Sequence, residues 1–440
     1  MKIAIQSLIL FFVSVPLLAQ KEVRTYYNPG HQLQEIYFTA DGGETMVGKY
    51  QRFYENGNPM MTGNFDDGQK NGLFSEYHEN GKLSRKIVYV NGLRHGAVEV
   101  FNEEGKPIQK AYYQNDILVD SIDIYFDNGN VKGKTFFVKG KPEGIVKEYY
   151  PDGKLRKEMT YKDGKPNGST LTFFNDGKIE TESFYKNGVL SGSYNTYFDN
   201  GQIETSSVMA EGTKNGKFKT YDRDGHLITD GNFVRGKLHG ENVGYFTDGS
   251  IRHRSNYKDG KKIGTNLEYY PGGKIKTKEI VLSNGIDLTQ TNYSESEIIL
   301  SEKKFRNEKL HGISTYYFED GKTPKVREVY DQGKLTGIRT SYFASGKVAR
   351  EETYKFNLIT GPVKTFYESN GLVESLSEYR SSRKQGPFVS YYEDGKVKEE
   401  GNYAADKKQG TWKAYDEKGN LTRTLIFRAG NLVEPQDGKK

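Results

Sequence analysis

The stretch Tyr149-Tyr150-Pro151-Asp152-Gly153-Lys154-Leu155 contains the turn that decides the fold. Proline suits the first corner of a type I turn, aspartate suits the second, and glycine suits the left-handed residue of the β-bulge that follows. This is a hairpin loop of three residues, and it places Tyr149 opposite Leu155. A two-residue Asp-Gly turn would pair Tyr149 with position 156 and would break the alignment of apolar side chains, so we prefer the three-residue loop.

The same turn recurs along the chain, mostly at intervals of 24 residues. Its glycines are Gly30, Gly57, Gly81, Gly105, Gly129, Gly153, Gly177, Gly201, Gly225, Gly249, Gly273, Gly321, Gly346, Gly371, Gly395 and Gly419, with Glu297 at the equivalent place in one unit. Each unit adds two strands to a sheet whose strands lie about 4.8 Å apart. The pattern predicts an all-β fold: an elongated antiparallel β-hairpin solenoid of about seventeen repeats of about 24 residues.

Three kinds of apolar position recur around the turn glycine. An aromatic residue stands four before it, as in Phe173 and Tyr367, an aliphatic residue two after it, and a large apolar residue eight after it, as in Tyr161. Because side chains alternate between the faces of a strand, the even offsets predict that the second and third positions share one face. The three-residue loop places the first position opposite the second across the hairpin. We therefore expect these three positions, aligned from repeat to repeat, to form the core.

A second connection, with glycines eleven and fifteen residues after the turn glycine, leads into the next hairpin, as at Gly164 and Gly168. Two units near 106–128 and 283–310 depart from the pattern. Gln114-Asn115-Asp116 lacks both connector glycines, and Ser283 to Lys304 lacks the hairpin glycine. Each irregular unit is either a bend in the array or drift in a tolerant repeat.

The composition favours a folded protein that does not bind nucleic acid. Only 34% of residues are hydrophobic, yet 33 Tyr and 24 Phe are far more aromatic residues than a disordered chain carries. The absence of cysteine excludes disulfides and thiolate metal sites. The 64 Lys and Arg are spread among 58 Asp and Glu, so the sequence forms no dense basic stripe for phosphate binding.

The N-terminus predicts export. Lys2 precedes an apolar run from Ile3 to Leu18, which is typical of a secretory signal peptide and short for a membrane anchor. We therefore expect a signal peptide at 1–20, a single repeat array at 21–440, and a periplasmic or extracellular protein without a membrane span after cleavage. An uncleaved anchor is the alternative, because the cleavage pattern around Leu17 and Ala19 is imperfect.

The repeat resembles the MORN repeat, in the bacterial variant found in proteins of the YwqK-type antitoxin family. The similarity rests on the stretch 149–155, on Tyr161-Lys162-Asp163-Gly164-Lys165-Pro166-Asn167-Gly168 and on Tyr391-Tyr392-Glu393-Asp394-Gly395-Lys396-Val397. It extends over nearly all of 21–440. The resemblance implies a β-hairpin array that acts as an interaction scaffold, a lipid contact or an organiser.

A search for chemistry yields no catalytic, cofactor-binding or metal-binding residues. Three histidines, His95, His239 and His311, share one repeat position before a connector glycine, which indicates a turn preference. Asp222-Arg223-Asp224-Gly225 lacks the first ligand and the terminal glutamate of a calcium loop, and we interpret it as a hairpin tip.

One set of aromatic residues exceeds what a one-sided core requires. These residues stand three before the turn glycine: Tyr54, Phe126, Tyr150, Phe174, Phe198, Phe246, Tyr270, Phe318, Phe343 and Tyr392. We expect them to form either an exposed aromatic ladder that binds a partner, or a cover over the shoulder of each turn.

The leading hypothesis is therefore an exported, non-catalytic scaffold that binds a protein along an extended β surface. The first alternative is a glycan or cell-wall binder that stacks sugars on the aromatic ladder. The second is a neutralising binder of the antitoxin or immunity type.

Overall fold

The computed structural model describes residues 20–27, 32–40 and 43–437. The chain divides into two compact units, Met1–Thr213 and Lys214–Lys440, and each is described by itself. The predicted signal peptide, apart from Gln20, and the first turn glycine, Gly30, lie outside the described residues.

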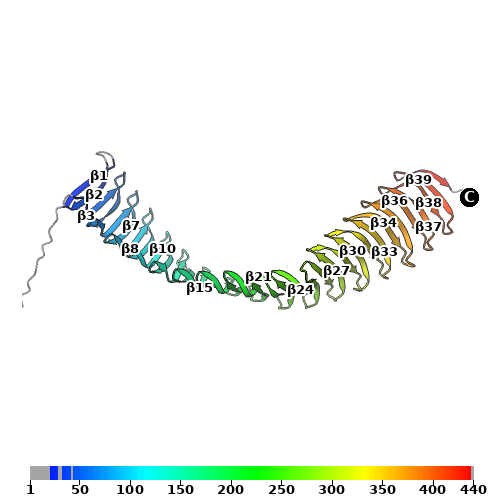
Figure 1. Ribbon diagram of the computed structural model, residues 1–440, viewed down its shortest axis with the longest axis horizontal. Helices are drawn as coiled ribbons and strands as arrows, with labels where there is room; N and C mark the ends of the chain where they lie inside the picture. The colour runs from blue at the N-terminus through cyan, green and yellow to red at the C-terminus, as the bar shows by residue number, and fades with distance from the viewer. Residues whose placement is uncertain (1–19, 28–31, 41–42, 438–440) are drawn as a thin grey trace, which may run out of the picture. The chain divides into compact units, whose positions relative to one another are not determined.

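Every regular element that the structure describes is a β-strand. The first unit contains β1 (Gln20–Tyr26), β2 (Leu33–Ala40), β3 (Met46–Phe53), β4 (Pro59–Asp66), β5 (Gln69–Lys70), β6 (Gly72–Tyr77), β7 (Leu83–Val90), β8 (Leu93–Phe101), β9 (Pro107–Gln114), β10 (Ile117–Tyr125), β11 (Val131–Val138), β12 (Lys141–Pro142), β13 (Gly144–Tyr149), β14 (Leu155–Lys162), β15 (Lys165–Phe173), β16 (Ile179–Lys186), β17 (Val189–Tyr197) and β18 (Ile203–Ala210). Strands that follow one another along this unit lie side by side and antiparallel, as in β13, β14 and β15 (Figure 1).

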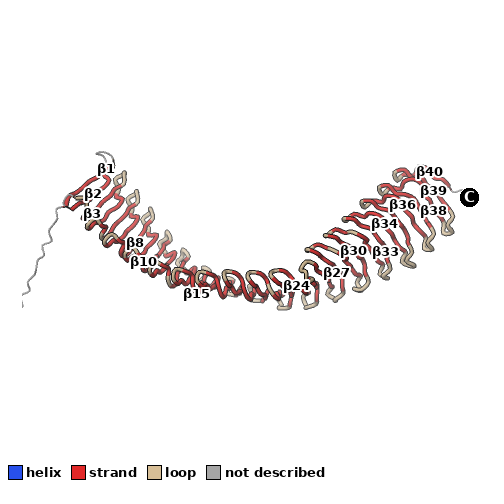
Figure 2. Tube along the Cα trace, in the orientation of Figure 1, coloured by secondary structure: helices blue, strands red, loops and turns tan. Residues whose placement is uncertain are grey.

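The second unit repeats the arrangement. It contains β19 (Thr213–Tyr221), which begins at the boundary, β20 (Leu227–Val234), β21 (Lys237–Leu238), β22 (Gly240–Tyr245), β23 (Ile251–Lys258), β24 (Lys261–Tyr269), β25 (Ile275–Val281), β26 (Asp287–Tyr293), β27 (Ile299–Arg306), β28 (Lys309–Leu310), β29 (Gly312–Tyr317), β30 (Pro324–Asp331), β31 (Lys334–Leu335), β32 (Gly337–Tyr342), β33 (Val348–Lys355), β34 (Leu358–Phe366), β35 (Val373–Arg380), β36 (Arg383–Tyr391), β37 (Val397–Ala404), β38 (Lys407–Tyr415), β39 (Leu421–Arg428) and β40 (Asn431–Asp437). Turns alternate between the two ends of the strands (Figure 2). The predicted all-β fold of antiparallel hairpins is confirmed.

The turn predicted at Gly153 has the expected geometry. The Gly153 amide donates to the Tyr150 carbonyl at 2.9 Å, the Tyr150 amide donates to the Lys154 carbonyl at 2.8 Å, and the φ of Gly153 is +88°. Tyr149 lies opposite Leu155. The three-residue loop and the pairing of its flanking side chains are therefore confirmed.

The second connection is a two-residue turn followed by a β-bulge. Asp163 and Gly164 both have positive φ, of 52° and 82°, which is the geometry of the type I′ turn that matches the twist of a hairpin. Gly168, with φ of +126°, lies where the pairing of β14 and β15 shifts register. The two connector glycines thus have different roles, one in the turn and one in the bulge.

Both irregular units keep the hairpin ladder. At Gln114-Asn115-Asp116, Asn115 and Asp116 adopt the positive φ values of the type I′ turn, 49° and 65°, and Gln114 pairs with Ile117. Glu297 adopts φ of +63° in place of glycine, and Tyr293 still pairs with Ile299. Asn and Asp tolerate this conformation better than other residues with a Cβ, which explains the first substitution. The hairpin ladder thus continues through both units, and whether either is a bend or drift in the repeat stays a prediction.

The most buried side chains lie in a column that the sequence analysis missed. We call it the central column: the residue seven before the turn glycine and its partner six after it, such as Phe74 and Ile87 around Gly81. Phe74 is 1% exposed and Trp412, at the equivalent place, is also 1% exposed. The aromatic residues four before the glycine are instead half-buried, apart from the exposed Tyr26.

A β-bulge explains why the expected columns are wrong. Glu76 pairs with Arg85, but the next residue, Tyr77, pairs with Leu83. Ser84 therefore has no partner in the ladder. Such an extra residue reverses which face the side chains point to, between the turn and the middle of the strand. The position eight after the glycine therefore shares a face with the central column, and the position two after it does not. Rings confirm this, since Tyr89 meets Phe74 edge to face at 5.3 Å.

One residue of the predicted aromatic column was also assigned wrongly. The loop before Gly371 is one residue longer, so Phe366 pairs with Val373 and takes the place that we predicted for Tyr367. Tyr367 belongs to the next position, and its hydroxyl donates to the Tyr391 carbonyl at 2.6 Å.

Large rings of the central column pack over glycines of a neighbouring hairpin. A Cβ atom on Gly63 would overlap the Phe74 ring, and a Cβ atom on Gly401 would overlap the Trp412 ring. The ammonium groups of Lys70 and Lys408 lie 4.8 and 3.8 Å from the centroids of these rings. A cation, an aromatic ring and a glycine thus form one packing unit, in which the glycine gives the ring room and the lysine stem covers it.

Phe74→Ala should destabilise its hairpin by about 3 to 5 kcal/mol, because it empties a fully packed site. Phe184→Ala removes the same ring from a place that is 44% exposed, and it should cost far less. Hydrogen exchange of β6 and β7, and of β16 and β17, measures the two losses locally. Equal losses would contradict the assignment of the central column.

Candidate functional site

The ten aromatic residues of the predicted ladder lie at the shoulder of each turn, and we call their position the shoulder column. None of the ten is exposed in the structure; all are half-buried. Half-burial favours the second of the two predicted alternatives, a cover over the turn shoulder, over an exposed ladder. Whether they contact a partner stays a prediction.

The tyrosines of the shoulder column bond to the next hairpin. The hydroxyl groups of Tyr54, Tyr150, Tyr270 and Tyr392 donate to the backbone carbonyls of Tyr77, Phe173, Tyr293 and Tyr415, at 2.8, 2.7, 2.9 and 2.8 Å. Each acceptor is the residue four before the next turn glycine, where the backbone ladder between hairpins ends. The phenol therefore continues the ladder beyond its last backbone bond.

Four hairpins have a polar residue at the shoulder position instead of a ring. Asn102, Asp222, Ser294 and Asp416 use their side-chain oxygens to accept backbone N–H groups of their own turn. In hairpins with a shoulder ring, this bond comes from the residue before the glycine, as with Asp152 and Asp394. In these hairpins the turn is thus capped either by the shoulder residue or by the residue before the glycine.

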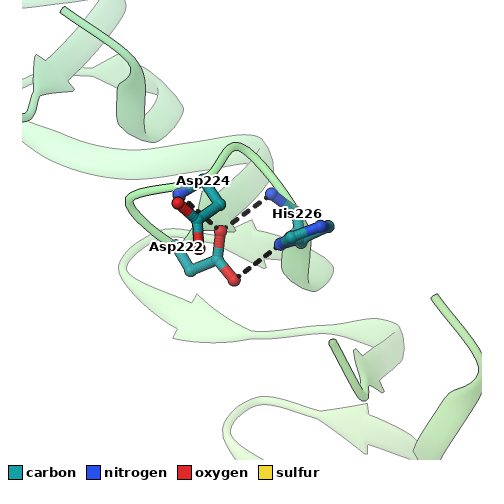
Figure 3. Close-up of side chains that lie close together, drawn as sticks. All are labelled: Asp222, Asp224 and His226. Atoms are coloured by element: carbon teal, nitrogen blue, oxygen red, sulfur yellow. Dashed lines mark hydrogen bonds and ion pairs between the residues drawn. The ribbon is translucent and has the colours of Figure 1, made fainter. Parts of the chain in front are cut away.

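Asp222, Asp224 and His226 form a group whose ligand atoms lie within 4.8 Å of one another (Figure 3). Asp222 already accepts from the amides of Asp224 and His226 at 3.0 and 2.9 Å, and from His226 Nδ1 at 3.0 Å. Burial raises the pKa of Asp222, but these hydrogen bonds outweigh it and hold the pKa below its usual value. The cluster is a capped turn, as the sequence indicated.

A polar groove of about 420 Å³ lies over β23, β24 and β25, on the face of the central column. In this part of the second unit the column is polar: Asn242, Ser255 and Asn266 are buried there. Asn266 Oδ1 accepts from the Asn256 amide at 2.8 Å, so the amide side chain satisfies the backbone at a bulge. Polar groups replace rings here without leaving the backbone unpaired.

The ionisable groups of the groove are paired with one another. Lys262 Nζ lies 2.9 Å from Glu279 Oε2, and Lys276 Nζ lies 2.9 Å from Glu268 Oε1. Burial, with the nearby charges of Arg252 and Lys262, lowers the pKa of His253. Both carboxylates are held by lysines, so the arrangement is an ion-paired groove.

The face opposite the central column carries a row of exposed apolar side chains. We call it the open row: the residue eight before the turn glycine and its partner seven after it. Its exposed members in the first unit are Leu73, Phe136, Ile145, Phe184 and Val208, and in the second unit Ile280, Ile313 and Ile338. Leu73 and Ile313 are 53% and 52% exposed. These residues recur at one repeat position in the sequence, and we did not predict them as a surface.

Eight segments of the chain match the family profile described as "MORN repeat variant": residues 46–67, 70–91, 94–115, 142–163, 166–187, 214–235, 335–356 and 384–405. The chain contains MORN-variant repeats. Each matched segment ends in or next to a type I′ connector, so the profile follows the hairpin period that the structure shows. The finer assignment to antitoxins of the YwqK type is not part of this match.

Among curated proteins no sequence matches the chain. A solved structure titled "Crystal Structure of TcdB2-TccC3" contains a similar chain, with 11% identity and a TM-score of 0.14. The alignment covers 95% of this chain and 28% of the other, so this chain spans less than a third of the length of that one.

The described residues include no helix with the length and apolar character needed to cross a membrane.

The shoulder bonds predict a stability effect. Tyr150→Phe keeps the ring and removes the donor to the Phe173 carbonyl, so it should destabilise the hairpin by about 1 kcal/mol. Tyr150→Ala should cost more, because it also uncovers the turn shoulder. Urea unfolding followed by hydrogen exchange measures both changes. If neither variant loses stability, the shoulder column is a recognition surface and not a packing element.

Buried tyrosines predict an alkaline transition. Burial, with the hydrogen bond to Glu302, raises the pKa of Tyr317 to about 12, and burial with a bond to Glu35 does the same for Tyr50. A raised pKa in the folded state favours the neutral phenol, so this stabilisation is present below pH 10 and is lost as pH rises through 12. The tyrosinate absorbance of Tyr317→Phe, subtracted from that of the original chain, isolates one group. Ionisation of Tyr317 near pH 10 would contradict the contact.

Proposed function

We propose that this MORN-variant repeat chain is a non-catalytic scaffold that binds a protein through its open row. The observation that carries the proposal is the exposure of large apolar side chains at one repeat position, on the face that the central column does not use. Exposed apolar surface in a regular array has no role in the packing of the hairpin, and such surface is typical of protein interaction sites.

The chemistry of the open row favours a protein partner. Its members are aliphatic or phenylalanine, as in Leu73, Ile145 and Phe184, and apolar contacts of this kind form the centre of protein interfaces. Charged residues stand in the adjacent position of the same face, such as the pair Lys147–Glu158, and would provide a polar rim.

Glycan binding through the shoulder column is less well supported. Sugar stacking requires an exposed ring face, and the shoulder rings are half-buried, with several hydroxyls already bonded to the next hairpin. A neutralising binder of the antitoxin type would use the open row in the same way as any other protein scaffold, so the identity of the captured partner distinguishes the two.

Export is a second part of the proposal. Strand β1 begins at Gln20, the last residue of the predicted signal, so the first described strand starts at the expected cleavage site. Mass spectrometry of the purified native protein should find an N-terminus near Gln20 or Lys21. An intact Met1 in a cytoplasmic fraction would overturn this part.

The open row can be tested within the first unit. The triple variant Leu73→Ser, Ile145→Ser and Phe184→Ser should weaken binding of a partner captured from cell extract by about tenfold or more, because it removes several apolar contacts. Each substitution should change stability by only about 0.5 kcal/mol, since the side chains are exposed.

The matched control is Leu93→Ser, Val138→Ser and Val189→Ser, which removes exposed apolar residues from the connectors. This control should bind as the original chain does. Binding that survives in the open-row variant, or that is lost in both, would overturn the proposal.

A further inference from the structure

We propose that the shoulder of the Asp222 hairpin holds a pocket for the side chain of a tyrosine supplied by a partner protein. The inference rests on the proposed function only in that the ligand belongs to a protein. It adds a second recognition element at a different place in the repeat, with a defined side chain as its occupant.

In other hairpins of the same unit, an aromatic ring fills the shoulder position. Tyr270 and Tyr392 cover the turn shoulder with a ring, and their hydroxyls donate to the carbonyls of Tyr293 and Tyr415 at 2.9 and 2.8 Å. The repeat therefore shapes this position for an aromatic ring, since Phe246, Phe318 and Phe343 also occupy it, and a hydroxyl on the ring reaches the carbonyl. The contacts that it offers are an apolar wall and one carbonyl acceptor.

At Asp222 the chain supplies no ring. The Asp222 carboxylate turns toward its own loop, where it is held by the amides of Asp224 and His226, as the dashed lines show (Figure 3). A pocket of about 290 Å³ is left beside it. Its apolar wall is formed by Leu227, Ile228, Tyr245 and Phe246, the last two from the next hairpin.

At the shoulder position of the Asp222 hairpin, the backbone carbonyl equivalent to these acceptors is that of Tyr245. Tyr245 pairs with Ile251, just as Tyr293 pairs with Ile299, so it is the equivalent of the residues that accept the shoulder hydroxyls. An ionised carboxylate has no hydrogen to donate, so Asp222 cannot replace the phenol at this carbonyl. A tyrosine from outside would offer both the ring and the donor.

The rim adds electrostatic complementarity to an aromatic ring. Arg252 lines the pocket, and a guanidinium is attracted to the face of a phenol ring. A cation also lies over a shoulder ring elsewhere, although it comes from the ring's own hairpin: Lys398 Nζ lies 5.5 Å from the centroid of the Tyr392 ring. Apolar wall, acceptor and cation together favour tyrosine over an aliphatic side chain.

The direct test uses p-cresol, which is the tyrosine side chain without its backbone, and toluene, which lacks the hydroxyl. Saturation-transfer NMR with the full chain should show p-cresol bound and competing with toluene, and toluene should bind about tenfold more weakly because it leaves the carbonyl unpaired. No binding of p-cresol would overturn the proposal. Equal binding of the two compounds would overturn the choice of tyrosine.

The decisive variant is Asp222→Tyr, which gives the hairpin its own shoulder ring. Asp224 stands where Asp394 caps the turn of a ring-bearing hairpin, so it can take over the turn bond. This variant should melt at a higher temperature and lose p-cresol binding by about tenfold or more, since the pocket is then filled. Unchanged binding would overturn the proposal.

The matched control is Asn102→Tyr, which makes the same change at a shoulder position of the first unit. It should leave p-cresol binding intact, and a loss there would overturn the assignment to Asp222. If Asp222→Tyr fails to fold, Ile228→Asp places a charge in the wall and should abolish binding. These measurements need no partner, so their outcome is independent of the open-row test.

Discussion

A sheet that is one layer thick can bury a side chain only against the hairpins on either side of it. The contact that satisfies this constraint is the central column, where Phe74 lies over Gly63 and meets Tyr89 edge to face. Gly63 leaves room for the Phe74 ring, and the stem of Lys70 covers its outer side. Stability therefore depends on combinations of residues in adjacent hairpins, which is the energetics expected of a repeat array.

The turns could be predicted from the sequence because one residue type fixes each of them. A left-handed residue in a three-residue loop favours glycine, so Gly153 and its equivalents define both the period and the pairing of Tyr149 with Leu155. The central column could not be predicted in the same way. Its residues differ in chemistry, from Phe74 to Asn266, and the bulge beside the turn reverses the alternation that would have located it.

The shoulder column shows a different limit of sequence reasoning. The sequence shows that an aromatic residue recurs three before the glycine. Recurrence alone does not show whether such a ring is exposed for binding or packed between hairpins. Only the hydroxyl of Tyr270 on the Tyr293 carbonyl shows that the ring joins two hairpins. The pocket beside Asp222 was still harder to find, because its signal is the absence of a ring in one unit and the direction in which one carboxylate points.

Neighbouring positions of one strand explain how such a repeat can acquire recognition without losing its fold. Leu73 is 53% exposed and Phe74 is 1% exposed, although they are adjacent in the chain. A change at the first position alters the open row and leaves the packing between hairpins intact, whereas a change at the second alters the stack. The shoulder position is less independent of the packing between hairpins. A ring there can be replaced by a polar residue, provided that this residue or the residue before the glycine accepts the backbone N–H groups of the turn. Asp222 is such an exchange, and the loss of one internal hydroxyl bond leaves an acceptor and an apolar wall that a partner's side chain can complete.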